Sequence, residues 1–268
     1  MATHHTPGEL KLRIKVRSGL VELRTREGDE TTVEIEPMDN SDASQEAARS
    51  ASQELNGDTL TIDVPHSNKL LRRSAKVRVS VVAPPGVSLR ASTASADVDA
   101  VGELGAFAVE TASGDVRAGV VGKDAHVRSA SGRITVEEVF GSASLHSVSG
   151  DVSVRKVGGR LDTKLVSGDL RIGEAAAAVS ANTVSGDITI ESAGLAETTL
   201  RAVSGDITVG VARGARVYLD VSSLSGDTTS QLDAADAPSS GEGEAHKLKA
   251  SSTSGDVHIR RAAPIAAG

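Results

Sequence analysis

The sequence predicts an all-β protein built as a parallel β-solenoid, a single-stranded and right-handed β-helix with 18-residue coils and an N-terminal β cap. The first observation is a repeated turn, because Ser-Gly-Asp occurs seven times in 268 residues. The second is its spacing, since successive repeat serines are 18, 18, 18, 18, 18, 19, 21 and 29 residues apart. Self-similarity at such a fixed period is typical of solenoids. The repeat serines are Ser95, Ser113, Ser131, Ser149, Ser167, Ser185, Ser204, Ser225 and Ser254, of which Ser95 and Ser131 begin the variant turns Ser-Ala-Asp and Ser-Gly-Arg.

Two short strands flank each turn, and their apolar residues recur in columns. Side chains alternate between the two faces of a strand, so residues three and five positions after the serine share a face. Stacked coils would bury these columns in one continuous core. After the turn the columns are Val116, Ile134, Val152, Leu170, Ile188, Ile207 and Val257, and Ala118, Val136, Val154, Ile172, Ile190, Val209 and Ile259. Before the turn they are Phe107, Ala125, Ala143, Leu161 and Val179, and Val109, Val127, Leu145, Thr163 and Ala181.

Other repeat folds fit these columns less well. A left-handed hexapeptide helix also has 18 residues per coil, but it would place an apolar residue every six positions, which this sequence does not do. Propeller blades are about 40 residues long, and an antiparallel sandwich would not repeat one turn at constant spacing. We expect a right-handed coil because crossovers between parallel strands are overwhelmingly right-handed.

The 18-residue period divides the chain into segments, according to where it holds and where it fails. We expect disorder over 1–8, a β-strand capping region over 9–92, solenoid coils over 93–261 and a tail over 262–268. A cap is needed because an open terminal coil exposes unpaired backbone groups. Within the 29-residue gap, an acidic stretch rich in Pro, Ser and Gly predicts a mobile loop over 231–245. Alternating residues predict strands at 10–17, 20–26, 31–36, 59–64 and 76–83, and the polar segment 40–55 predicts a loop or short helix.

The composition limits which molecules the protein is expected to bind and where in the cell it is expected to be. The 36 acidic residues outnumber the 29 basic ones, and the chain has only two Phe and one Tyr, so nucleic-acid binding is not expected. The absence of cysteine excludes disulfides and thiolate sites. No segment has the pattern of a signal peptide or the roughly 18 apolar residues of a membrane span. We therefore expect a soluble, cytoplasmic protein.

The repeated aspartates admit a structural and a metal-binding interpretation. In the structural one, each Asp or Ser side chain accepts a backbone N–H within its own turn, and Gly supplies a left-handed or strained conformation. In the other, the stacked carboxylates hold calcium, although calcium-binding β-rolls use a nine-residue Gly-rich repeat. We favour the structural one and expect no metal site. The aspartates are Asp115, Asp151, Asp169, Asp187, Asp206, Asp227 and Asp256.

The sequence gives less support for an active site than for a structural role of the repeated turn. Asp162 and Lys164 lie outward on one predicted strand, near Arg128 and His146 by column, which allows a polar patch. His126 and His146 have no orienting acid that the sequence identifies, and three aromatic residues in the chain argue against a sugar-binding cleft. No phosphate loop or dinucleotide motif is present. We therefore expect no catalytic residue, no cofactor and no enzyme activity.

The repeated Ser-Gly-Asp-(Val/Ile)-X-(Val/Ile) unit, following an N-terminal strand region, resembles the bacterial toastrack or adhesin-type β-strand-repeat family. The resemblance covers about residues 9–261. It implies a coiled β architecture and a non-enzymatic sensing, scaffolding or adhesive role, with an association with the cell envelope in many members.

Two functional hypotheses follow. The first is a non-enzymatic scaffold or sensing module that binds another macromolecule, a protein partner or a second copy, through its outward ranks and the 231–245 loop. The alternative is a calcium-dependent or polysaccharide-acting β-helix module. A weakly capped last coil could also pair end to end with a second copy. The coil of Ser225 is the least hydrophobic, because its inward columns hold the polar residues Thr228 and Ser230, and we expect it to open most readily.

Overall fold

The computed structural model describes residues 2–65, 75–194, 196–212, 216–232 and 246–262. It confirms an all-β chain and the predicted parallel β-solenoid, with one helix among the described residues. The chain divides into two compact units, 1–136 and 137–268, which we describe in turn. The predicted loop 231–245 falls, from residue 233 onward, outside the described residues, as does the predicted tail from residue 263.

Unit 1 contains the N-terminal elements and the first coils of the solenoid. Its long strands β2 and β7 each bend through a repeat turn, so that one strand supplies both sides of a coil. The elements are β1 (Ala2–His5), β2 (Lys11–Thr25), β3 (Glu30–Pro37), α1 (Asp42–Ser50), β4 (Ser52–Asn56), β5 (Thr59–Asp63), β6 (Val77–Ala83), β7 (Val87–Thr111), β8 (Val116–Val121) and β9 (Ala125–Ser131), and β10 (Ile134–Val139) begins in this unit.

The solenoid begins earlier than the sequence predicted. Strand β2 pairs in parallel with β7, and the register sets Ser18 opposite Ser95, so β2 is itself a coil inside the expected capping region 9–92. Its offset from the next coil is 77 residues rather than 18, because 26–86 are inserted between them. On the other side of β2, strands β5 and β6 pair with it in parallel and form a further, outer coil.

Antiparallel strands and the helix complete this part of unit 1. Strand β3 pairs antiparallel with β6, β4 with β5, and β1 with β3. The sequence predicted disorder over 1–8, whereas β1 forms ladder pairs along its whole length. Helix α1 lies within the segment 40–55, where the sequence left a loop or a short helix open. Ser41 caps it by accepting a hydrogen bond from the Ser44 N–H at 3.2 Å, and its buried face includes Ala43 and Ala47.

From β11 to β18, unit 2 repeats the coil at offsets of 18 or 19 residues. Two parallel ladders form the two sides of the coils, β11–β13–β15–β17 before the turns and β12–β14–β16–β18 after them. The inward columns are buried as predicted, with Val154, Ile172 and Ile190 at most 1% exposed. The strands are β11 (Ala143–Ser149), β12 (Val152–Val157), β13 (Leu161–Ser167), β14 (Leu170–Ala175), β15 (Val179–Ser185), β16 (Ile188–Ala193), β17 (Thr198–Ser204), β18 (Ile207–Val211), β19 (Val217–Ser225), β20 (Thr228–Ser230), β21 (His246–Ser254) and β22 (Val257–Arg261).

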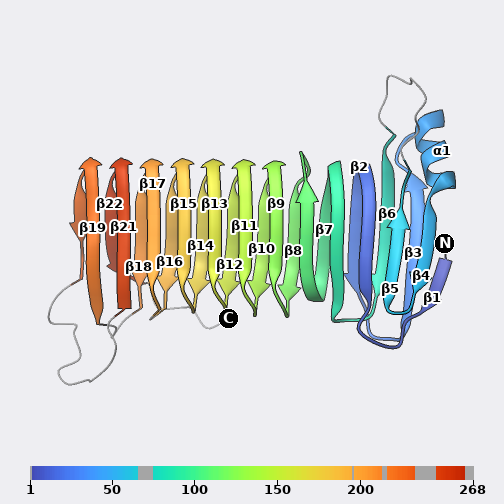
Figure 1. The fold of residues 1–268 in the computed structure, drawn as a ribbon, viewed down its shortest axis with the longest axis horizontal. Helices are drawn as coiled ribbons and strands as arrows, with labels where there is room; N and C mark the ends of the chain where they lie inside the picture. Colours follow the sequence, from blue (N-terminus) through green and yellow to red (C-terminus); the bar gives the residue numbers. More distant parts are fainter. Residues whose placement is uncertain (1, 66–74, 195, 213–215, 233–245, 263–268) are drawn as a thin grey trace. The chain divides into compact units, whose positions relative to one another are not determined.

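The last two coils of unit 2 are stacked in the reverse of their sequence order. Strand β21 pairs with β17 on one side and with β19 on the other, so it lies between them (Figure 1). After the turn, β22 likewise pairs with both β18 and β20. The inner coil has the apolar columns of Val257 and Ile259, which are at most 1% exposed, whereas the outer coil has Thr228 and Ser230. The more apolar coil thus takes the position with two neighbours.

An inward charge should unfold the array. Val154→Asp buries a carboxylate with no partner at a position that is 1% exposed, so we expect loss of several kcal/mol and of the cooperative β-sheet signal in circular dichroism. Ser153→Asp is the matched control. Ser153 is only half-buried, and it lies beside Arg171 in the register of β12 and β14, so a carboxylate there would have a cationic neighbour. A Val154→Asp protein with an unchanged melting temperature would contradict the inward assignment.

Removing a buried hydroxyl group should stabilise the protein, in contrast to the buried charge. Thr163 is fully buried between Leu145 and Ala181 of the adjacent strands, and its Oγ1 has no hydrogen-bond partner among the described residues. Thr163→Val keeps the shape and removes the unpaired polar group, so the free energy of unfolding should rise by about 1 kcal/mol in urea denaturation. Thr199→Val on the outward face of β17 is the control, with an expected change within about 0.5 kcal/mol. Destabilisation by Thr163→Val would show that the hydroxyl is paired.

Candidate functional site

The Ser-Gly-Asp turns are joined by a ladder of hydrogen bonds between neighbouring coils. In unit 2 the Oδ1 atoms of five repeat aspartates each accept the backbone N–H of the aspartate in the adjacent coil, over 2.8 to 3.1 Å. The sequence predicted that these carboxylates accept within their own turn, and that is wrong: the acceptor and donor belong to different coils. The donor–acceptor order is Asp169 to Asp151, Asp187 to Asp169, Asp206 to Asp187, Asp256 to Asp206 and Asp227 to Asp256.

The turn glycines are required by close approach of the backbones. Gly186 has a φ of +133°, and a Cβ there would overlap the carbonyl oxygen of Gly168 in the neighbouring coil. Gly205 and Gly255 have the same conformation and the same kind of contact. Since both Gly and Asp serve the stacking, the repeated triplet is architectural.

The ladder can be tested at one rung. Asp187→Asn keeps an acceptor oxygen and removes a charge from between Asp169 and Asp206, so we expect stability within about 0.5 kcal/mol of the wild type, or higher at low salt. Asp187→Ala removes the acceptor of the Asp206 N–H and should cost about 1 to 2 kcal/mol. Urea denaturation at two salt concentrations measures both. Equal losses for the two variants would show that the oxygen is not the stabilising element.

The geometry of the turns does not support the alternative hypothesis that the stacked aspartates bind calcium. Throughout the described ranges, no cluster of three or more His, Cys, Asp or Glu side chains has a metal-binding arrangement. The aspartate Oδ1 atoms of the ladder are already hydrogen-bonded to backbone N–H groups.

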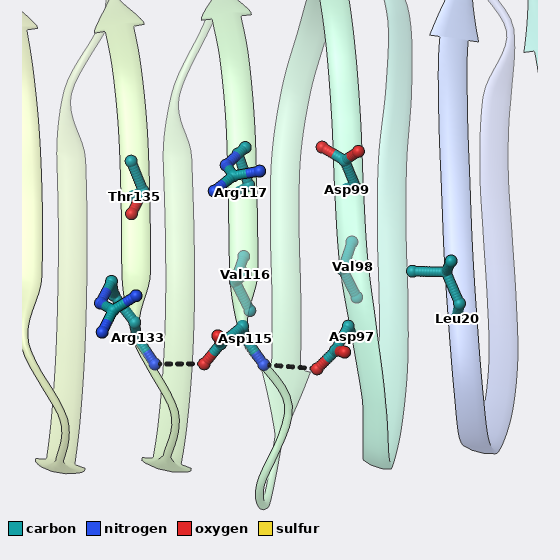
Figure 2. A pocket seen from close by; sticks show the side chains of 9 residues that line it. All are labelled: Leu20, Asp97, Val98, Asp99, Asp115, Val116, Arg117, Arg133 and Thr135. Atoms are coloured by element: carbon teal, nitrogen blue, oxygen red, sulfur yellow. Dashed lines mark hydrogen bonds between the residues drawn. The ribbon is translucent and has the colours of Figure 1, made fainter.

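A shallow groove of about 250 Å³ lies on the outward face of unit 1 (Figure 2). Asp115 takes part in two rungs there, donating its N–H to Asp97 at 2.9 Å and accepting that of Arg133 at 2.8 Å. The groove brings together carboxylates and guanidinium groups, so its charges largely balance. Its lining residues are Leu20, Asp97, Val98, Asp99, Asp115, Val116, Arg117, Arg133 and Thr135.

Asp99 of that groove combines an ion pair with a buried carboxylate oxygen. Its Oδ2 accepts a hydrogen bond from Arg24 Nη2 at 3.1 Å, while its Oδ1 is buried without a hydrogen-bond partner among the described residues. Arg117 and Arg133 are exposed, and neither forms an ion pair within the part of the chain that the structure describes. The sequence analysis assigned no site role to either arginine, because their proximity depends on the stacking of coils. The groove contains no nucleophile paired with a base.

Within unit 2 the structure brings together three residues of the polar patch that the sequence placed around Asp162. His146 Nε2 lies 3.4 Å from Asp162 Oδ1, and Lys164 stands beside His146 in the register of β11 and β13. Arg128 belongs to unit 1, where its Nη1 lies 4.0 Å from Glu110 Oε1. His126 is half-buried on β9. The His146–Asp162 pair is about one-third exposed, as expected for a solvated outer face.

An exposed rank of valines runs along the same face of unit 2. The residue before each repeat serine is valine in four consecutive coils, and these side chains are 49 to 54% exposed. Sequence reasoning missed this rank, although valine recurs there with the coil period. Its residues are Val148, Val166, Val184 and Val203, one from each of β11, β13, β15 and β17.

A family model described as Toastrack DUF4097 matches residues 10–260 of the chain. The chain belongs to this family. Membership confirms the resemblance drawn from the repeated turn, and it places the coils of both units within a single family match. No helix among the described residues of this toastrack chain has the length and apolar character needed to cross a membrane.

Solved structures similar to this toastrack chain have low sequence identity to it. A putative adhesin from Bacteroides fragilis is 13% identical, with a TM-score of 0.49 and coverage of 96% of this chain and 95% of that one. A putative lipid binding protein from Parabacteroides distasonis is also 13% identical, with a TM-score of 0.43 and the same coverage. A putative adhesin from Parabacteroides distasonis is 10% identical, with a TM-score of 0.39 and coverage of 96% of each chain. A comparison with curated proteins finds no match.

Proposed function

We propose that this toastrack chain is a non-enzymatic scaffold that binds another protein through the outward face of β11, β13, β15 and β17. The observation that carries the proposal is the valine rank. Isolated exposed apolar residues are ordinary, but an uninterrupted apolar row points to an interaction surface. The parallel register holds the four side chains at the coil spacing of about 4.8 Å, so the row is rigid before any partner binds.

The side chains beside the valines suggest the character of the partner. Two residues earlier on each strand, facing the same way, stand His146, Lys164, Asn182 and Arg201. This neighbouring rank has two cationic groups and no carboxylate. A partner segment with apolar side chains flanked by acidic ones complements both ranks. The valines would supply burial, and the cations would orient the partner.

The proposal is tested by removing apolar surface without altering the strands. The double variant Val166→Thr/Val184→Thr keeps the β-branched shape, and it should weaken partner binding by about 1.5 kcal/mol, or roughly tenfold in Kd. Proteins captured from the native cell on immobilised wild type are identified by mass spectrometry. Binding of each captured protein to the variant is then titrated.

Thr189→Ser/Thr208→Ser, on the outward face of β16 and β18, is the matched control and should leave binding unchanged. Equal affinity of wild type and the valine variant for every captured protein would refute the proposed surface. The sequence-derived alternative gives a different result: binding lost in a chelator, or turnover of added polysaccharides. The predicted cytoplasmic location belongs to this proposal, and cell fractionation tests it.

A further inference from the structure

Within the described ranges, the outermost coil of unit 2 has a backbone edge that no other strand pairs with. Among the described residues, β19 has β21 as its one hydrogen-bonded neighbour and β20 has β22. A strand in this position presents unpaired N–H and C=O groups that can pair with another chain. The edge is nine residues long on β19, which is enough for an intermolecular ladder.

The core is also incompletely covered at this edge. The inward side chains of β19 are half-buried, whereas Leu248 and Ala250, their counterparts on β21, are at most 1% exposed. On the outward face Tyr218 is 61% exposed and Leu224 is 84% exposed. The half-buried inward residues include Val217, Leu219 and Val221.

The strand lacks the features that usually protect an edge. Natural edge strands carry lysine, proline or a bulge that discourages pairing. Between Val217 and Ser225 the one charged residue is Asp220, and the register with β21 has no shift. The sequence therefore does not oppose the addition of a strand here.

We propose that this edge binds a second copy of the chain, with the two β19 strands antiparallel and Val221 on the two-fold axis. Val221 is the middle residue of β19, so this register pairs the whole strand with itself. Tyr218 then lies opposite the partner's Leu224, and Asp220 opposite the partner's Ser222, whose hydroxyl can donate to the carboxylate. On the inward side Val221 meets its own counterpart, which extends the core across the junction.

The neighbouring register is less favourable. Centring the pair on Asp220 would place the two Asp220 carboxylates directly opposite each other, and like charges in that position are destabilising. The Val221 register contains no like-charged pair. This proposal does not depend on the valine rank, which lies on other strands, so either can fail without the other.

Disulfide cross-linking tests the register, because the chain contains no cysteine. Opposite residues of an antiparallel pair have Cα atoms about 4.5 to 5.5 Å apart, within the range that a disulfide spans. Val221→Cys should form a covalent dimer under mild oxidation. Ser222→Cys alone should not, but mixed with Asp220→Cys it should form a heterodimer. Thr199→Cys, on the outward face of β17 and outside the valine rank, is the matched control and should stay monomeric.

The wild-type mass and its single tyrosine provide an independent readout. Sedimentation should give twice the chain mass of 27.3 kDa at high concentration, falling to the monomer on dilution. Because the chain has one tyrosine and no tryptophan, iodide quenching of its intrinsic fluorescence reports on Tyr218 and should increase on dilution. Val221→Lys should give a folded monomer by circular dichroism.

Three results would overturn the proposal. The first is a monomer at every concentration with Val221→Cys remaining uncrosslinked. The second is a monomer whose Tyr218 is protected at every dilution, which would mean that the chain covers its own edge. The third is preferential cross-linking of Leu219→Cys, which would show a different register.

Discussion

Neighbouring coils approach so closely at the Ser-Gly-Asp turns that no Cβ fits between their backbones, and the rest of each unit is arranged around that contact. Glycine makes the approach possible, and the aspartate oxygen of one coil receives the N–H of the next. Each turn therefore fixes the height and the register of its neighbour. Once the register is fixed, the alternation of side chains sends valine and isoleucine inward and the polar ranks outward.

The sequence predicted the regular part of this structure because its period and its columns are local signals. Val154 and Ile190 could be assigned inward from their offset to the nearest repeat serine alone. The coil at Ser18 was not recognised, since its turn is Ser-Gly-Leu and the inserted residues break the spacing. The stacking order of the last coils could not be derived from spacing, because the paired residues of β17 and β21 are 50 positions apart in the sequence. The polar inward residues Thr228 and Ser230 did indicate that their coil is the outermost one, because polar side chains are tolerated best where one side of the coil is open.

In the candidate sites, too, contacts between coils could not be predicted from the sequence. The sequence identified the aspartates as architectural and placed His146 near Asp162, and the structure agrees on that pair. The acceptor of each turn was assigned wrongly, because an aspartate can satisfy a backbone N–H in either its own or an adjacent coil, and the choice depends on the stacking distance. The groove around Asp99 and the valine rank arise from stacking as well. Functional surface in a solenoid is thus made by alignment between coils more than by any one repeat.

The reversed order of the last coils has a consequence for the way the protein is made. During translation 217–230 leave the ribosome before 246–261, yet the later segment occupies the position between them and β17. The earlier coil cannot take its native place until the later one has been synthesised. A nascent chain that stops short of residue 246 would lack the neighbour of β19, so the C-terminal unit can finish folding only when its full sequence is present.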